Sequence, residues 1–121
     1  MRQIKFRAWD TDRKMIREVK RLYFEDAGYS VEFVADGTVY GDLFPLMQFT
    51  GLLDKNGKEI YESDIVKFRV WSDTFERHII EFSHGAFVIK AGYGEYYGAK
   101  ELEADRLEVI GSIYENPELL K

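Results

Sequence analysis

The chain has 121 residues and a formal net charge of −5, with 45% hydrophobic, 32% charged and 16% aromatic residues. A chain of this length can bury about two-thirds of its surface, and its aromatic content excludes a disordered polyampholyte. Because it lacks cysteine and any long apolar run, we expect no disulfide framework, thiolate zinc site or membrane span, and a single compact domain over 1–121 in the cytoplasm.

Charge is distributed unevenly along the chain. Residues 1–21 contain eight basic and three acidic residues, whereas the remainder contains nine basic and 19 acidic ones. A protein that is acidic overall repels nucleic-acid phosphates, although its basic N-terminal segment could form a local patch. The simpler interpretation is that this segment neutralises acidic residues elsewhere in the chain.

The N-terminal segments predict strands. In 3–9 every second residue is apolar, which predicts an amphipathic strand with Lys5, Arg7 and Trp9 on its other face. Residues 15–24 are ambiguous, because their apolar spacing fits a helical stripe but no convincing N-cap precedes them. We expect a strand there and keep an amphipathic helix as the alternative.

Two turns predict hairpins. Asp36-Gly37 separates two alternating runs, and a turn over 54–58 separates a strand over 46–52 from the one that follows. Tight hairpin turns need positive φ, which glycine accepts readily and asparagine more readily than most residues. We therefore expect Asn56 and Gly57 at positive φ.

The rest of the chain predicts more short strands. They are expected over 58–71, 75–82, 86–91 and 107–114. Asn116-Pro117 is typical of the N-cap and first residue of a short terminal helical turn. The expected fold is therefore mainly β and built of antiparallel hairpins.

Three blocks of the sequence resemble the YopX family of phage and prophage proteins. They are Lys5-Phe6-Arg7-Ala8-Trp9-Asp10, the run from Phe49 to Val66 that contains the 54–58 turn, and the ending over 109–120. The chain departs from the family at Leu53, where lysine is more usual, and at Ser63, where glycine is more usual. The resemblance implies a mostly β fold, with an N-terminal β layer over 1–45 and a small SH3-like barrel over 46–121. It implies no catalytic residue, because the family's motifs have no assigned chemistry.

The sequence contains no convincing catalytic or metal-binding set. Glu62 and Asp64 could form an acid–base pair, but the simpler interpretation is a turn whose aspartate bonds backbone amides. His78 and His84 lack metal-ligand spacing. Ser83 and His84 are neighbours on an extended chain, so we expect their side chains to point to opposite faces and to form no nucleophile–base pair. We expect no cofactor, no metal and no enzymatic activity.

Two surface features are candidate interaction sites. The face with Lys5, Arg7 and Trp9 could stack a base and bind phosphates, or could be a second buried layer with charge pairs. The loop with Tyr93, Tyr96 and Tyr97 has the composition of an adaptable binding loop, or covers a sheet edge.

The leading hypothesis is a non-enzymatic interaction module of a phage or prophage in the bacterial cytoplasm. Its expected partner is a phage or host protein, or a second copy of itself, bound through the β surface. The alternative is a nucleic-acid-associated accessory protein that uses the basic N-terminal strand. An enzyme with an unrecognised carboxylate site is the weakest hypothesis, because the sequence contains no recognisable nucleophile, metal set or phosphate loop.

Overall fold

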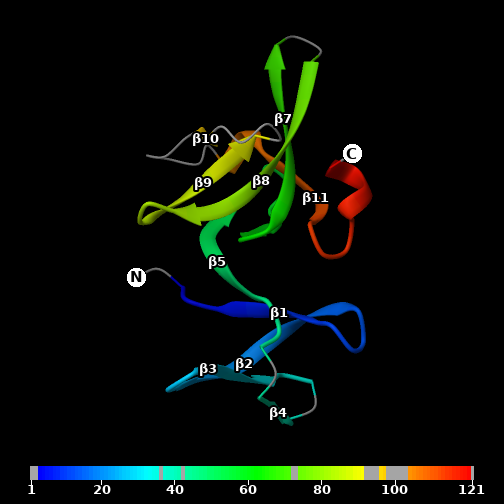
Figure 1. Ribbon diagram of the computed structural model, residues 1–121. Helices are drawn as coiled ribbons and strands as arrows, with labels where there is room; N and C mark the ends of the chain where they lie inside the picture. The colour runs from blue at the N-terminus through cyan, green and yellow to red at the C-terminus, as the bar shows by residue number, and fades with distance from the viewer. Residues whose placement is uncertain are drawn as a thin grey trace. The chain divides into compact units, whose positions relative to one another are not determined.

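The computed structural model is mainly β, as expected (Figure 1). It describes residues 3–35, 37–41, 43–71, 74–91, 96–97 and 104–120. The chain divides into two compact units, Met1–Gln48 (unit 1) and Phe49–Lys121 (unit 2). Over the described ranges, no helix is long and apolar enough to cross a membrane.

Unit 1 is an antiparallel sheet. Its strand order is β4-β3-β2-β1, followed by the first residues of β5. The bounds are β1 Phe6–Asp10, β2 Met15–Glu25, β3 Gly28–Phe33, β4 Val39–Tyr40 and β5 Leu46–Leu53. The predicted hairpin around Gly37 is confirmed, because β3 pairs with β4 and Gly37 has a φ of 68°.

Residues 15–24 lie in a strand, so the helical alternative is wrong. The register of β2 against β3 shifts between Val19 and Arg21, where β2 contains one residue more than β3 over the same stretch. This β-bulge moves the apolar side chains out of strict alternation. Their spacing therefore imitates a helical stripe within an extended strand.

The core of unit 1 lies on one face of its sheet. Ala8, Val31, Phe33 and Phe44 are buried there, and half-buried neighbours pack against them: Val19, Leu22, Tyr29, Tyr40 and Leu46. Ile4 lies outside this core with 62% of its surface exposed. The first strand accordingly begins later than predicted, at residue 6.

Unit 2 contains a five-stranded antiparallel sheet in the order β10-β9-β8-β7-β11. The strands are β7 Asp64–Trp71, β8 Thr74–Ser83, β9 Ala86–Ala91, β10 Tyr96–Tyr97 and β11 Glu108–Ser112. The second half of β5 pairs separately with β6, Glu59–Tyr61. Among the described residues no sheet closes on itself, so the expected SH3-like barrel is not confirmed.

The strand predicted over 58–71 is two strands, because the chain turns at residues 62–63. Ser63 has a φ of 70°, which interrupts the extended backbone. Its N–H donates to the carbonyl of Ile80 at 2.7 Å, and its carbonyl accepts from the N–H of Ile113 at 3.0 Å. Serine therefore keeps the left-handed conformation for which glycine is better suited.

The 54–58 turn forms as predicted, with one correction. Gly57 has a φ of 82°, but Asn56 does not have positive φ. The N–H of Gly57 donates to the carbonyl of Asp54 at 3.0 Å. Of the three residues between Asp54 and Lys58, only the third, Gly57, is left-handed. The turn therefore requires glycine at that position alone.

The core of unit 2 is larger and aliphatic. It is formed by Ile60, Val66, Ile80, Ile89, Ala104, Leu107 and Val109. A 3-10 turn, η1 Ala104–Arg106, leads into β11.

The predicted terminal helical turn is present as a second 3-10 helix, η2 Pro117–Leu120. The carbonyl of Asn116 accepts from the N–H of Leu119 at 3.0 Å. Its side chain points the other way and accepts from the N–H of Ser112 at 3.3 Å. The Asn116 side chain thus closes the bend after β11 instead of capping the helix.

Candidate functional site

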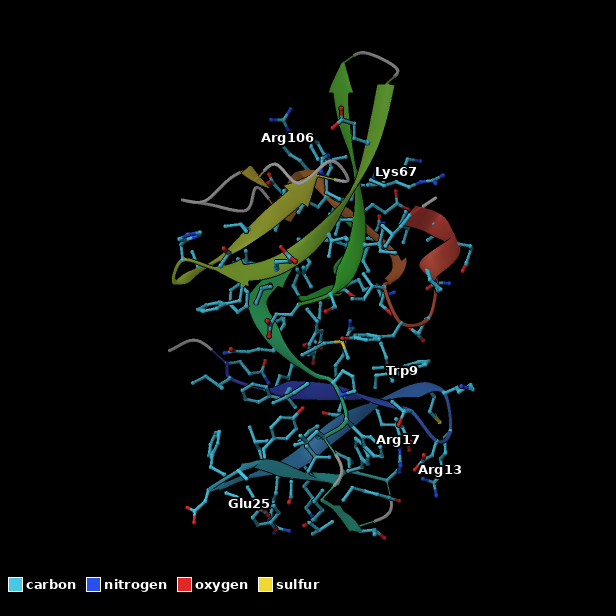
Figure 2. All side chains as sticks on the ribbon, viewed as in Figure 1. Trp9, Arg13, Arg17, Glu25, Lys67 and Arg106 are labelled. Carbon is cyan, nitrogen blue, oxygen red and sulfur yellow. The ribbon has the colours of Figure 1, made fainter. Side chains whose placement is uncertain are left out.

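A buried carboxylate organises the turn between β1 and β2. Asp10 Oδ1 accepts the backbone N–H groups of Asp12 and Arg13, both at 3.0 Å. Its Oδ2 accepts the guanidinium groups of Arg13 at 3.2 Å and Arg17 at 3.1 Å. Burial alone would raise the pKa of Asp10, but these donors outweigh it and hold the pKa below its ordinary value. Arg13 and Arg17 lie together at this end of unit 1 (Figure 2).

A second carboxylate engages further basic residues of β2. Glu32 is nearly buried and accepts two hydrogen bonds from Arg21, at 3.1 and 3.0 Å. Lys20 lies 3.8 Å from the same carboxylate, and the Tyr23 hydroxyl donates to it at 3.3 Å. Much of the positive charge of the N-terminal segment is therefore neutralised within unit 1.

The predicted basic face on β1 is half covered. Lys5, Arg7 and Trp9 are all half-buried. Arg7 Nε donates to the Met47 sulfur at 3.4 Å, and Arg7 lies opposite Glu18 in the strand register. Cross-strand partners in an antiparallel pair share a face, so an acidic residue adjoins this basic one.

The predicted tyrosine loop lies mostly outside the described residues. Tyr93 is outside them altogether. Tyr96 and Tyr97 form β10 and pair with Lys90 and Ile89, but their side chains are outside the described part.

A hollow of about 230 Å³ lies beside β2 in unit 1. Its lining residues are Met15, Ile16, Arg17, Glu18, Phe33, Val34 and Ala35. The Arg17 guanidinium stacks over the Phe33 ring at 4.2 Å. Met15 and Val34 expose 47% and 53% of their surface at this site. We call this site the β2 hollow; its lining is mostly apolar beside a charged group.

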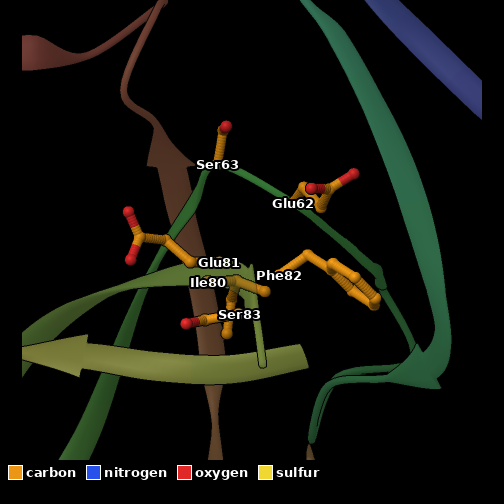
Figure 3. Close-up of a pocket in the computed structure, with 6 residues that line it drawn as sticks. All are labelled: Glu62, Ser63, Ile80, Glu81, Phe82 and Ser83. Carbon is orange, nitrogen blue, oxygen red and sulfur yellow. The ribbon is translucent and has the colours of Figure 1, made fainter. Parts of the chain in front are cut away.

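A second hollow, of about 320 Å³, lies in unit 2 and is shown in Figure 3. Its lining residues are Glu62, Ser63, Ile80, Glu81, Phe82 and Ser83. The carboxylates of Glu62 and Glu81 point away from each other. Two carboxylates that share acid–base work must instead converge on one substrate position, so this hollow lacks that geometry.

One expectation about this region is wrong. Ser83 Oγ and His84 Nδ1 are hydrogen-bonded at 2.8 Å instead of pointing to opposite faces. The reason is the φ of 52° at His84, which turns the chain out of the extended form. The pair is exposed, and none of the described carboxylates bonds the other ring nitrogen of His84 as a catalytic triad would require.

His78 and Glu76 form the second histidine pair. His78 is buried, its Nε2 lies 2.8 Å from the Glu76 carboxylate, and its ring centroid lies 4.8 Å from that of Phe68. Over the described residues no group of three or more potential ligands could hold a metal ion. The observed role of His78 is packing within unit 2.

The residues that carry the YopX resemblance hold unit 2 together. Asp54 Oδ1 accepts the N–H groups of Asn56 and Lys58, and its Oδ2 accepts that of Val109 at 2.9 Å. Burial would raise the pKa of Asp54, but these three amides hold it below its ordinary value. The buried Asp64 accepts the N–H of Tyr61 at 2.8 Å. The structural interpretation of Asp64 is thereby supported over the catalytic one.

The β2 hollow was not among the candidate sites predicted from sequence. Its residues belong to two segments, 15–18 and 33–35, whose proximity depends on the register of β2 against β3. One signal was available: 15–24 is longer than the strands predicted on either side of it. A longer strand leaves part of its edge beyond the end of its neighbour.

Comparison with known proteins adds the following findings. The model of the family described as YopX protein matches residues 5–121. The solved structure of protein EF1440 from Enterococcus faecalis is 28% identical in sequence and has a TM-score of 0.70. The match covers 100% of this chain and 100% of the EF1440 chain. The solved structure of protein yopX from Bacillus subtilis is 23% identical in sequence and has a TM-score of 0.67. This match covers 100% of this chain and 98% of the yopX chain. No curated protein matches.

Proposed function

The chain belongs to the YopX protein family, and from this premise we propose that it is a non-enzymatic protein-interaction module of phage or prophage type. Its partner is a phage or host protein in the bacterial cytoplasm, and the contact surface lies in unit 1. The observation that carries the proposal is the use of the buried carboxylates. Asp10, Asp54 and Asp64 all accept hydrogen bonds that hold turns and strands in place.

Groups used in this way are poor catalysts. A general base must reach a substrate proton, and a general acid needs a pKa near the working pH. Asp10 and Asp54 are buried and have pKa values below the ordinary one. They therefore remain ionised and inaccessible, and catalysis would need a different set of residues.

Exposed apolar side chains on unit 1 favour a protein partner. Large hydrophobic residues there with at least 39% of their surface exposed are Ile4, Met15, Tyr23, Phe24, Val34, Val39 and Leu43. Aromatic and apolar side chains provide the anchors of protein interfaces without requiring a charge of one sign. Phe24, which is 84% exposed, is the extreme case.

A nucleic-acid partner is the second candidate, and the charge pairs weigh against it. Unit 1 contains eight basic and eight acidic residues. Arg13, Arg17 and Arg21 already bond carboxylates. Phosphate binding depends on net positive charge that can replace counterions, and a neutral unit provides little of it.

Two measurements test the proposal. The tagged full chain is used to capture proteins from a bacterial lysate. The matched variant combines Met15→Asp with Phe24→Asp, which changes exposed apolar side chains near both ends of β2, and we expect a reproducible partner that this variant loses. Binding to mixed DNA and RNA is measured at about 50 mM salt, where weak phosphate contacts are still detectable. Tight nucleic-acid binding that Lys5→Glu with Arg7→Glu abolishes would establish the second candidate instead.

A second copy of the chain is also a candidate partner. The described sheets are open, and exposed strand edges favour pairing between chains. Light scattering across a concentration series measures this directly. We expect a mass above that of one chain at high micromolar concentration, and a constant mass of 14.2 kDa would exclude self-association.

A further inference from the structure

The long strand β2 changes partners along its length. Residues 15–18 pair with β1 through the register Arg7↔Glu18 to Asp10↔Met15. From Val19 onward β2 pairs with β3 on its other side. Within the part of the chain that the structure describes, no strand pairs with residues 15–17 on the β3 side.

The chain that would cover this edge turns away from it. The N–H of Val34 donates to the carbonyl of Glu18 at 3.0 Å, and among the described residues this is the last backbone bond between the two segments. The N–H of Gly37 then donates to the carbonyl of Phe33 at 3.3 Å, and residues 34 and 35 lie in a turn. β2 therefore extends beyond the end of β3.

The backbone at this edge offers both a donor and an acceptor. In an antiparallel strand the N–H and C=O of one residue point to the same side, and the side alternates along the chain. Because the carbonyl of Glu18 points toward Val34, the N–H and C=O of Ile16 point to that side too. Trp9, opposite Ile16, directs its own N–H to the Pro45 carbonyl on the far side, at 2.9 Å, as this alternation requires.

The β2 hollow lies at this edge. Its lining comes from both segments that border the edge, and its floor includes the stacked pair of Arg17 and Phe33. Met15 on its rim is a flexible apolar side chain that can adapt to a bound group. A strand added along 15–17 would place its side chains alternately toward and away from this hollow.

Positive charge near this edge favours acidic residues in a bound segment. Residues 10–17 contain three basic side chains, Arg13, Lys14 and Arg17, against Asp10 and Asp12, so this segment carries one positive charge in excess. Arg13 and Arg17 both bond the carboxylate of Asp10. Arg13 is half exposed, and the neighbouring Lys14 is exposed. The acidic member of the lining, Glu18, lies opposite Arg7 in the register, which offsets its charge.

We propose that residues 15–17 of β2 bind an extended segment of a partner protein by strand addition. The segment places an apolar side chain in the β2 hollow and an acidic side chain beside Arg13 and Lys14. In this mode main-chain hydrogen bonds provide affinity and the pocket for alternate side chains provides specificity. The inference rests on the proposed function and names the site and chemistry of the partner.

The test uses random peptides displayed on filamentous phage and selected on the immobilised full chain. An enriched peptide is synthesised with a fluorescent label and titrated by fluorescence polarisation. We expect enriched peptides to carry an apolar residue next to aspartate or glutamate. We also expect the amide hydrogen of Ile16 to exchange more slowly when the peptide is bound.

Two matched pairs of variants locate the binding site. Ala35→Tyr fills the hollow, whereas Ala27→Tyr makes the same change in an exposed turn at the other end of β3. Lys14→Glu and Lys58→Glu change the net charge equally, but Lys58 is an exposed residue of the 54–58 turn in unit 2. We expect the first member of each pair to weaken binding about tenfold, which is typical of a lost interface anchor, and the second to change it less than about twofold.

The results separate this inference from the proposed function. Absence of any enriched peptide, or unchanged binding to both Ala35→Tyr and Lys14→Glu, overturns the strand-addition site. If the Ala35→Tyr variant still captures the same protein from the lysate, the strand-addition site is overturned. The proposed interaction function is not. Each variant is first checked for cooperative urea unfolding. Because Ala35 and Lys14 are exposed and lie in different segments, one unstable variant does not decide the outcome.

Discussion

The carboxylate of Asp54 and the backbone N–H of Val109 are hydrogen-bonded at 2.9 Å across 55 positions of sequence. The same carboxylate holds its own turn through Asn56 and Lys58. The adjacent N–H of Lys55 donates to the carbonyl of Leu107 at 3.0 Å. One aspartate therefore joins the central and C-terminal blocks that carry the family resemblance.

Replacing Asp54 with asparagine should destabilise the protein. The amide keeps one oxygen but presents an N–H₂ group to a backbone donor, which leaves that buried donor unsatisfied. We expect Asp54→Asn to lower the free energy of unfolding by about 2 kcal/mol, the scale of a hydrogen bond to a charged group. Urea denaturation at neutral pH measures the loss, and an unchanged midpoint would contradict it.

The contribution of Asp54 should depend on pH. Its pKa is below the ordinary 3.8 in the folded state, so the unfolded chain binds its proton more readily. The stability that Asp54 contributes is present above pH 3.8 and is lost as the pH falls through the lower folded value. The difference between the wild type and Asp54→Asn should therefore shrink in acid, whereas a constant difference would show that the carboxylate's charge is not involved.

Replacing Ser63 with glycine should stabilise the protein. Ser63 has a φ of 70°, a conformation that costs a residue with a side chain roughly 1–2 kcal/mol. Glycine removes this strain but loses more backbone entropy on folding, about 0.5–1 kcal/mol. We expect a net gain of about 0.5 kcal/mol in thermal or urea unfolding, and a loss of stability would show that the serine side chain contributes to the turn.

Replacing Gly57 with valine should have the opposite effect. Its φ of 82° lies in the left-handed region, and no atom crowds the position of a β-carbon there. The cost is therefore conformational, and we expect a loss of about 1 kcal/mol or more for a β-branched residue. Chemical denaturation that shows no loss would mean that the turn adopts another conformation.

Replacing Gly111 with alanine tests the bend after β11. A β-carbon there would overlap the Asn116 side chain, which accepts the N–H of Ser112. We expect Gly111→Ala to destabilise by about 1–3 kcal/mol, as overpacking does. Asn116→Ala removes the two nearest crowding atoms, Oδ1 and Cγ, and leaves only Cβ close by, so the double variant should lose less than the sum of the two single changes. Strict additivity would show that the two residues do not contact each other.

Strand positions could be predicted because alternation and turn residues are local signals. Gly37 and Gly57 marked turns correctly. The ambiguity at 15–24 had a physical cause, since the bulge after Val19 breaks the alternation that identifies a strand. Lys14, Ser63 and His84 adopt positive φ without being glycine, which residue preferences alone do not indicate.

The candidate site was less predictable than the fold. Lys5, Arg7 and Trp9 alternate as expected, but the partners that half cover Arg7 come from β2 and β5. The β2 hollow depends on where β3 ends relative to β2, which pairing decides and composition does not. Sites built from strand register are visible only once the register is known.

The link between Asp54 and Val109 also has a consequence for the order of folding. The internal contacts of unit 1 need only the first 48 residues, so this unit can form early during synthesis. The turn around Asp54 can form locally as well, but its carboxylate meets Val109 only after a 55-residue loop closes, and closing such a loop costs entropy. Until β11 emerges from the ribosome, Leu107 and Val109 are missing from the core of unit 2 and the edge of β7 that β11 covers stays open. We therefore expect the nascent chain to pass through a stage in which unit 1 is formed and the core of unit 2 is incomplete.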